Sequence, residues 1–301
     1  MTRIAVIGDL HGFWDERDTD YFNDADYEQI LFLGDLPRLA GGEEVAREIS
    51  QLRRPALLIP GNHDGSTVLQ LYAEMCHRER AARRLSRGQE ERVRALEVAL
   101  GPVLLAGYSL HDCGEFSIIA ARPHSMGGDR LYFADYLDRQ FGIDSLAASA
   151  ERLRNLVDRA AEQVLFLAHN GPSGLGDEPD SIWGCDFDPA RGDFGDHDLR
   201  QAIDYAWRTG RRVRAVLAGH MHHRVSGGYR PWCRFEGETL HLNAARVPRV
   251  KHAEEGKLRH HLRLEIYGNE TRATEIWVGD DLNEIPGSTA TGACEGAAAE
   301  W

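Results

Sequence analysis

Short apolar runs that end abruptly in polar residues recur along the first part of the chain. The first three are RIAVIGD (3–9), QILFLGD (29–35) and ALLIPGN (56–62), each ending in glycine plus a polar residue. Two more, QVLFLAHN (163–170) and RAVLAGHMHH (214–223), follow later. Runs of this length with a sharp polar end are typical of buried strands that stop at a turn.

Segments with a helical spacing of apolar residues lie between several of these runs. Residues 41–54 show this spacing and have acidic residues in their first turn. Further helices are predicted within 145–162 and 197–208. Strands that alternate with helices indicate parallel β-α-β units. Their carboxyl ends gather at one edge of a sheet, which is where open α/β sheets bind ligands.

The rest of the chain completes a single predicted domain over residues 1–283. Residues 66–100 are charged and helical in pattern, and we interpret them as a solvated helix pair, with a cap over the site as the alternative. The late runs ETLHLNAA, HLRLEIYG and ATEIWVGD alternate without intervening helices, which predicts antiparallel strands that complete a second sheet. Residues 284–301 are mostly small, and we expect a flexible C-terminal tail there.

Composition narrows the class of protein. Of the 301 residues 42% are hydrophobic and 28% charged, as in a soluble globular protein, and no apolar stretch approaches the roughly 18 residues of a membrane span. The five cysteines form no Cys-x-x-Cys pair, and no signal-peptide pattern is present, so we expect a cytoplasmic protein. A formal net charge of -13 makes nucleic acid an unfavourable partner but still allows a small anionic substrate.

Metal-capable side chains follow five of the predicted strands. In chain order they are Asp9, His11, Asp35, Asn62, His63, Asp64, His169, His220 and His222. Each residue alone is more often a turn or surface residue than a ligand, but random placement would seldom produce the whole set at successive strand ends. Carboxylate, amide and imidazole donors without cysteine favour hard or borderline divalent cations. Their number suits two ions that share one carboxylate.

The ordered series Asp-x-His, Gly-Asp, Gly-Asn-His-Asp, His and Gly-His-x-His resembles the calcineurin-like metallophosphoesterase superfamily. These elements stand at residues 9–11, 34–35, 61–64, 169 and 219–222. The resemblance implies a mixed α/β fold in four layers, with two stacked mixed β-sheets flanked by helices. It also implies an enzyme that hydrolyses phosphate esters through attack by hydroxide that a pair of divalent ions activates.

The resemblance further implies a role for each matched residue. One cation would be held by Asp9, His11, Asp35 and His222. The other would be held by Asp35, Asn62, His169 and His220, so that Asp35 bridges the two. His63 would be the catalytic histidine, close to the phosphate without binding metal, and Asp64 would orient it. Mn²⁺ is the expected ion, with Fe, Zn or Ni as alternatives.

The substrate is less constrained than the reaction, and we expect a small phosphomonoester or phosphodiester, with nucleotides among the candidates. A phosphoprotein phosphatase is disfavoured, because Pro60 stands where that branch has an arginine and Leu36 follows Asp35 where it has Asp-Arg-Gly. A nuclease would need a basic groove. A non-catalytic scaffold of the same fold tends to lose ligands that are present here. Arg122 and His124 could face the substrate or form a polar loop, and the substrate-binding residues stay unassigned.

Overall fold

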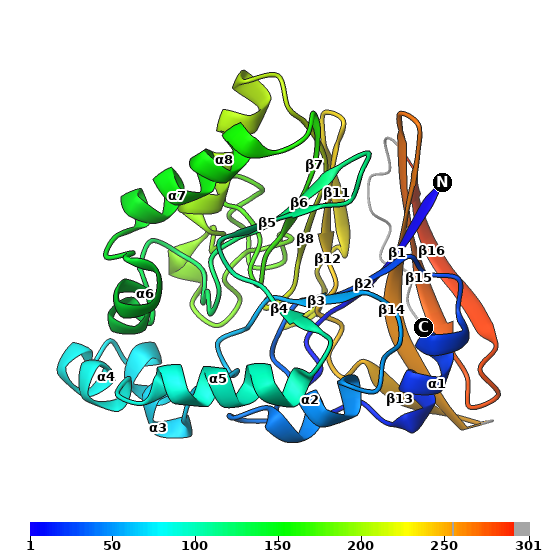
Figure 1. Cartoon of the computed structure of the whole chain (residues 1–301), viewed down its shortest axis with the longest axis horizontal. Coiled ribbons are helices and arrows are strands. Elements are labelled where there is room, and N and C mark those ends of the chain that lie inside the picture. The colour runs from blue at the N-terminus through cyan, green and yellow to red at the C-terminus, as the bar shows by residue number, and fades with distance from the viewer. Residues whose placement is uncertain (255, 292–301) are drawn as a thin grey trace.

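The structure of the protein is a computed structural model that describes residues 1–254 and 256–291. Within these residues two β-sheets stack on each other, and helices cover the outer face of each sheet (Figure 1). The layers therefore run helix, sheet, sheet, helix, which confirms the predicted fold class. In this described part, no helix is long and apolar enough to cross a membrane.

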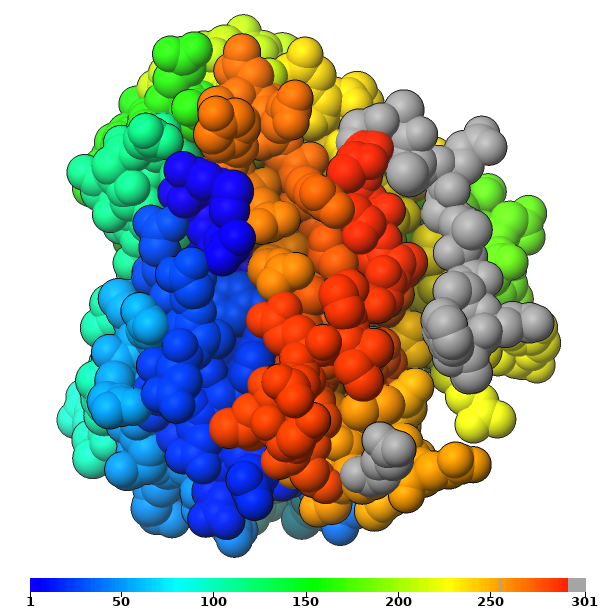
Figure 2. All heavy atoms as spheres, turned by 90° about the vertical axis from the view of Figure 1, so that its right-hand side faces the viewer, coloured from blue at the N-terminus to red at the C-terminus, as the bar shows by residue number. Residues whose placement is uncertain are grey.

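The first sheet joins parallel strands from the start of the chain to antiparallel strands from its end. The parallel strands are β1 (Thr2–Ile7), β2 (Gln29–Phe32), β3 (Ala56–Leu58) and β4 (Leu104–Leu105). On the other side of β1 lie β14 (Gly256–Tyr267), β15 (Glu270–Val278) and β16 (Glu284–Thr291), with β13 (Val250–Ala253) paired to β14. Figure 2 shows these C-terminal strands, orange to red, beside the blue N-terminal segment.

The second sheet is built around four parallel strands, and its two edge strands are antiparallel. In spatial order it contains β11 (Cys233–Glu236), β12 (Thr239–Asn243), β8 (Arg212–Ala218), β7 (Gln163–Leu167), β6 (Ser117–Ala120) and β5 (Ser109–Asp112). A separate two-stranded ribbon consists of β9 (Arg224–Val225) and β10 (Gly228–Tyr229). The ribbon directly follows the last metal-capable histidine of the sequence motifs, His222.

Two expectations for the C-terminal region are wrong. Of the three late runs, only ETLHLNAA joins the second sheet, as β12, while the other two form β14 and β15 beside β1. The flexible tail expected from residue 284 does not begin there, because residues 284–291 form β16, pair with β15 and bury Ala290. Alternation of apolar residues identifies a strand but says nothing about its partner. Residues 292–301 of the expected tail lie outside the described residues.

Helices cover both sheets. Beside the first sheet lie α1 (Glu16–Asp24), α2 (Glu43–Ile49) and α5 (Gln89–Leu100), and beside the second lie α6 (Ala134–Phe141), α7 (Leu146–Arg159) and α8 (His197–Arg208) (Figure 1). The segment 66–100 also holds α3 (Val68–Met75) and α4 (Glu79–Leu85). It therefore forms three helices where a pair is expected, and α5 packs on α2 with Leu96 and Leu100 buried. A single 3₁₀ turn covers Pro189–Arg191.

The parallel strands are apolar on both faces because each sheet lies between two other layers. Along β1, Ala5 and Ile7 belong to the core beneath α1, α2 and α5, whereas Ile4 and Val6 belong to the core that includes the second sheet. This alternation follows from the two-residue period of a strand. The polar residues that end these runs are therefore the first positions at which the chain leaves the core.

Candidate metal centre

The structure places the seven predicted ligands after five strands of both sheets. Asp9 and His11 follow β1, Asp35 follows β2, Asn62 follows β3, His169 follows β7, and His220 and His222 follow β8. The first three of these strands are parallel neighbours in one sheet, and β7 and β8 are parallel neighbours in the other. Their carboxyl ends therefore meet where the two sheets adjoin, as expected for a ligand site of an α/β protein.

Three donors converge on one point from Asp9, His11 and His222. The Nε2 atom of His222 lies 3.1 Å from the Nε2 atom of His11 and 3.4 Å from the Oδ2 atom of Asp9. This Asp9 oxygen is buried and accepts no well-formed hydrogen bond from the described residues. Ligand atoms of these three residues all lie within 4.8 Å of one another. Such an arrangement of lone pairs fits a cation.

A second set of donors surrounds Asp35. The Nε2 atom of His169 lies 3.6 Å from the Oδ2 atom of Asp35 and 3.0 Å from the Oδ1 atom of Asn62. The His220 ring lies beside that of His169, with 5.0 Å between the ring centroids. The same Asp35 oxygen is 4.0 Å from the Nε2 atom of His11, which belongs to the first set. Asp35 thus stands between the two sets, in the position that a bridging ligand requires.

Backbone carbonyl groups fix which nitrogen of three histidines faces the centre. The Nδ1 atoms of His11, His63 and His169 lie 3.3, 2.6 and 2.5 Å from the carbonyl oxygens of Pro37, Leu39 and Leu33, respectively. A carbonyl oxygen can only accept, so each Nδ1 carries the proton and each neutral ring keeps its lone pair on Nε2. Sequence reasoning missed these partners, because every residue has a carbonyl group.

The ligand loops have unusual backbone conformations. His11, Asp35 and His220 adopt positive φ angles of 45°, 52° and 64°, although none of them is glycine. Non-glycine residues in this region are uncommon and gather at functional sites. The glycines of the motifs have a steric reason, since a Cβ atom on Gly61 would lie 2.2 Å from Asp35 Oδ1 and one on Gly219 would lie 2.3 Å from Asp9 Oδ1.

Asp64 does not orient His63 as the sequence predicts. Its buried carboxylate accepts hydrogen bonds from the backbone N–H groups of Gly61, Asp35 and Leu36, at 2.7, 2.8 and 2.9 Å. The His63 ring is held by the Leu39 carbonyl group instead. Asp64 therefore fastens the loop after β3 to the loop after β2. Its place next to His63 in the sequence reflects this structural role.

The electrostatics of the cluster also fit cations. Burial alone would raise the pKa of Asp9 and of Asp35, but the surrounding imidazoles outweigh it and hold both pKa values below the ordinary range. Burial and the charge of Asp35 raise the pKa of Asp64 to about 7. Burial and the nearby His169 lower the pKa of His220 to about 3, so His220 is a neutral imidazole. Buried carboxylates and neutral imidazoles at such distances are the donors that divalent ions bind.

Comparison with known proteins agrees with this geometry. The family model for calcineurin-like phosphoesterases matches residues 2–224. The chain belongs to this family. A search of curated proteins finds no significant match.

Several solved structures resemble this chain at low sequence identity. Vps29 from Entamoeba histolytica complexed with Zn²⁺ is 14% identical, with a TM-score of 0.41 over 96% of this chain and 99% of that one. A predicted phosphoesterase from Streptococcus pneumoniae is 13% identical, with a TM-score of 0.36 and 97% of each chain covered. Sulfate thiohydrolase SoxB from Thermus thermophilus, in complex with glycerol, is 13% identical, with a TM-score of 0.43. The match covers 85% of this chain and 40% of the SoxB chain.

A pocket of about 530 Å³ opens beside the candidate metal ligands. One side of the pocket consists of Asn62, His63, His220 and His222. The remaining lining residues are mostly apolar or aromatic side chains, joined by two acidic and two basic ones: Met75, Met126, Tyr132, Asp186, Phe187, Asp188, Arg191, Phe194, Met221 and Arg224. The sequence assigns none of them, because they come from α3, a 3₁₀ turn, β9 and loops that lie far apart along the chain.

A buried arginine, Arg230, holds the backbone of the candidate ligand His222. Its Nε atom donates to the carbonyl oxygen of His222 at 2.7 Å. Its Nη1 atom donates to the carbonyl oxygens of Ser181 and Gly184, and its Nη2 atom donates to Asp186 at 2.7 Å. Arg230 therefore joins the loop of His222 to the loop that forms part of the pocket wall.

Arg122 and His124 are buried and line no part of this pocket. Arg122 forms ion pairs of 2.8 Å with both Asp196 and Asp198. The Nδ1 atom of His124 lies 2.9 Å from the carbonyl oxygen of Gly61. Of the two readings left open by the sequence, these contacts fit the polar loop between strands.

Proposed function

We propose that the protein is a binuclear, metal-dependent phosphoesterase that hydrolyses a small phosphomonoester or phosphodiester. The observation that carries this proposal is the placement of Asp35, whose Oδ2 atom is 4.0 Å from His11 Nε2 and 3.6 Å from His169 Nε2. A carboxylate between two sets of imidazole and oxygen donors suits a shared ligand of two ions. Membership of the calcineurin-like phosphoesterase family supports phosphate esters as the substrates.

The donor set determines which residues would hold each ion. Asp9, His11, Asp35 and His222 suit one cation. Asp35, Asn62, His169 and His220 suit the other. Bound divalent cations would supply a Lewis acid for the phosphoryl oxygens and would lower the pKa of the attacking water. Oxygen and imidazole donors without thiolate favour Mn²⁺, with Fe, Zn or Ni as alternatives.

His63 is positioned to act on the leaving oxygen of the substrate. Its Nδ1 proton is engaged by the Leu39 carbonyl oxygen at 2.6 Å, so Nε2 is the nitrogen that exchanges a proton. His63 also lines the pocket beside the ligands, and its Nε2 atom lies 3.9 Å from Asp35 Oδ2. From this place the imidazolium can donate a hydrogen bond or a proton to the oxygen that departs from phosphorus.

The test combines metal analysis with two simple substrates. The full chain is stripped with a chelator and assayed on an aryl phosphate monoester and on a bis-aryl phosphodiester while Mn²⁺ is added back. We expect no turnover after stripping, recovery with Mn²⁺, and two bound ions per chain by elemental analysis. The ratio of the two rates then assigns monoester or diester preference.

Two results would contradict the proposal. Full activity in metal-free buffer would exclude metal-dependent catalysis. A protein that binds two ions but hydrolyses neither ester at any metal concentration would favour the scaffold alternative. We also propose a small phosphate ester as the partner of this protein and a cytoplasmic location.

A further inference from the structure

We propose that the pocket beside the metal centre binds a planar aromatic group that the substrate carries on its phosphate. This inference rests on the proposed function, because the metal ligands place the phosphate at one side of the pocket. It goes further by naming the chemical class of the substituent. Phe187, Phe194 and Met75 are the residues that would select it.

The pocket lies where a substituent of the phosphate must go. Its volume of about 530 Å³ falls within the range of roughly 300–1,000 Å³ that is usual for small-molecule sites. His63, His220 and His222 belong both to the metal centre and to the pocket lining. A phosphate held by the metal centre therefore leaves the rest of its molecule beside the other residues that line the pocket.

Those other lining residues, the wall of the pocket, are mostly aromatic or apolar. Phe187 stands edge-on to Phe194, with 5.2 Å between the ring centroids and an interplanar angle of 89°. Phe194 is buried, but the Phe187 side chain is 65% exposed and that of Met75 is 58% exposed. Both exposed side chains belong to one pocket. A ligand that covers them removes apolar surface from water, which makes binding more favourable. Methionine and phenylalanine both make favourable contacts with a flat ring.

Three of the four charged side chains that line the pocket, Asp186, Asp188 and Arg191, are already engaged with protein partners. Asp186 accepts a hydrogen bond from Arg230, and Asp188 pairs with Arg191 at 3.4 Å. Arg191 also bonds to the Nε2 atom of His77 at 2.9 Å, and its guanidinium lies 5.5 Å from the centre of the Phe194 ring. A sugar or polyol needs hydrogen-bond partners that are not satisfied elsewhere. The wall therefore favours a ring over a polyol.

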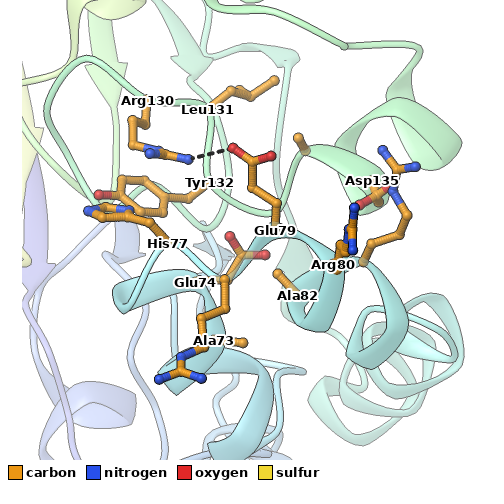
Figure 3. Close-up of a pocket in the computed structure, with 13 residues that line it drawn as sticks. Ala73, Glu74, His77, Glu79, Arg80, Ala82, Arg130, Leu131, Tyr132 and Asp135 are labelled. Carbon is orange, nitrogen blue, oxygen red and sulfur yellow. Dashed lines mark hydrogen bonds and ion pairs between the residues drawn. The ribbon is translucent and has the colours of Figure 1, made fainter.

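The neighbouring pocket is a poor alternative site for an aromatic group. This second pocket has a volume of about 340 Å³. Figure 3 shows Tyr132 and His77 on its left, Glu79 beside Arg130, and Glu74 below them. Tyr132 lines both pockets and so lies between them. The second pocket is lined mainly by charged side chains, including an ion pair between Arg130 and Glu79 at 3.2 Å. An uncharged ring bound there would remove these charged side chains from water without forming hydrogen bonds to them, which is unfavourable.

Two phosphonates that cannot be hydrolysed test the inference. The binding of 1-naphthylphosphonate and of methylphosphonate to the Mn²⁺-loaded full chain is measured by calorimetry. Neither probe has a leaving group, so the intrinsic reactivity of aryl esters does not enter the comparison. We expect the naphthyl compound to bind about tenfold more tightly or better, since an aromatic ring in an apolar pocket contributes on this scale.

Variants show whether this preference comes from the proposed wall. Phe187→Ala should reduce the ratio of the two dissociation constants most of the way to one, and Met75→Ala, on a separate element, should reduce it less. Tyr267→Ala is the matched control, because Tyr267 ends β14 and is 66% exposed, close to the 65% of Phe187. It should leave the ratio unchanged.

The outcomes separate this inference from the proposed function. Equal binding of the two phosphonates, binding of neither, or an unchanged ratio in Phe187→Ala would overturn the aromatic pocket. A protein that prefers the naphthyl compound through Phe187 but hydrolyses no ester would retain the pocket and overturn the phosphoesterase. A protein that hydrolyses esters but does not prefer the naphthyl compound would retain the phosphoesterase and overturn the aromatic pocket.

Discussion

The imidazole of His63 donates a hydrogen bond of 2.6 Å from Nδ1 to the carbonyl oxygen of Leu39. The side chain next in sequence, Asp64, is turned away from the ring and binds backbone N–H groups of the ligand loops. The orientation of His63 therefore depends on the path of the main chain after Asp35. A substitution of the Leu39 side chain would leave this contact intact.

Replacing His63 with alanine should separate catalysis from metal binding. Because His63 donates to the leaving oxygen in the proposed mechanism, His63→Ala should lose about 10² to 10⁴-fold in turnover on an ester with a poor leaving group. Elemental analysis should still find two ions per chain. Loss of an ion in His63→Ala would instead make His63 a ligand, a possibility that its position within 4.8 Å of donors from His11 and Asp35 allows.

The two sets of donors should respond differently to substitution. His222 faces only the set of Asp9 and His11, so His222→Ala should leave one ion per chain. Asp35 stands between both sets, so Asp35→Asn should weaken both ions. Metal titration followed by elemental analysis measures the stoichiometry. The exposed His252 on β13 provides the control, since His252→Ala should keep both ions. Equal loss in His222→Ala and Asp35→Asn would argue against a bridging Asp35.

Arg230→Met should weaken both the fold and the metal centre. The change leaves the carbonyl oxygens of His222, Ser181 and Gly184 without their donor. Each unsatisfied buried group costs about 1–3 kcal/mol, so the free energy of unfolding should fall by roughly 3 kcal/mol or more. Because the loop of His222 loses its support, metal affinity should fall about 10 to 100-fold.

Urea unfolding and metal titration measure these two effects of Arg230→Met. Arg53→Met is the control, because Arg53 is exposed and its guanidinium pairs with the exposed Asp24, at 3.4 Å. It should change stability by about 0.5 kcal/mol or less. Unchanged metal affinity in Arg230→Met would mean that the position of His222 does not depend on this arginine.

Two buried histidines on β14 predict a loss of stability in mild acid. Burial lowers the pKa of His260 to about 4, although the adjacent Glu275 opposes the shift, and burial also lowers the pKa of His261 well below its usual value. Both pKa values lie below the unfolded value of about 6.5, so the unfolded chain takes up protons first as the pH falls. The stability contribution of these neutral rings is complete above about pH 6.5 and is lost towards pH 4.

Urea unfolding between pH 7 and pH 5 measures this effect. The contribution of His260 alone should fall by roughly 2 kcal/mol over that interval. His260→Gln keeps a polar side chain beside Glu275, whose Oε1 atom lies 3.3 Å from His260 Nε2, and removes the titration. The variant should therefore lose less stability than the wild type on acidification. Identical pH profiles would show that His260 is not neutral in the folded protein.

The sequence predicts the parallel strands and the donors after them for a simple physical reason. A strand buried on both faces must be apolar throughout, so the first polar residues mark its end, and parallel strands end at the same edge. Asp9, Asp35 and His169 could be placed in this way. The motifs supplied the division of the ligands between two ions, which the spacing of the residues does not contain.

Other features depend on contacts between distant segments and leave no local signal. The pairing of β14 with β1 is one example, and the order in β16, whose small residues resemble a tail, is another. Leu39 acts through a carbonyl group that any residue would supply. Arg230 is one of many arginines in the sequence, and only the folded chain shows that it is buried against His222.

The candidate ligands are divided between the two sheets, with Asp9 and Asp35 on one and His169 and His222 on the other. Ions held among them would act as cross-links between two halves of the molecule. At a free ion concentration one hundred times the dissociation constant, such a link adds about 2.7 kcal/mol to the folded state. A cell short of the metal would then lose this protein to proteolysis as well as to inactivity, and its abundance would follow the metal supply.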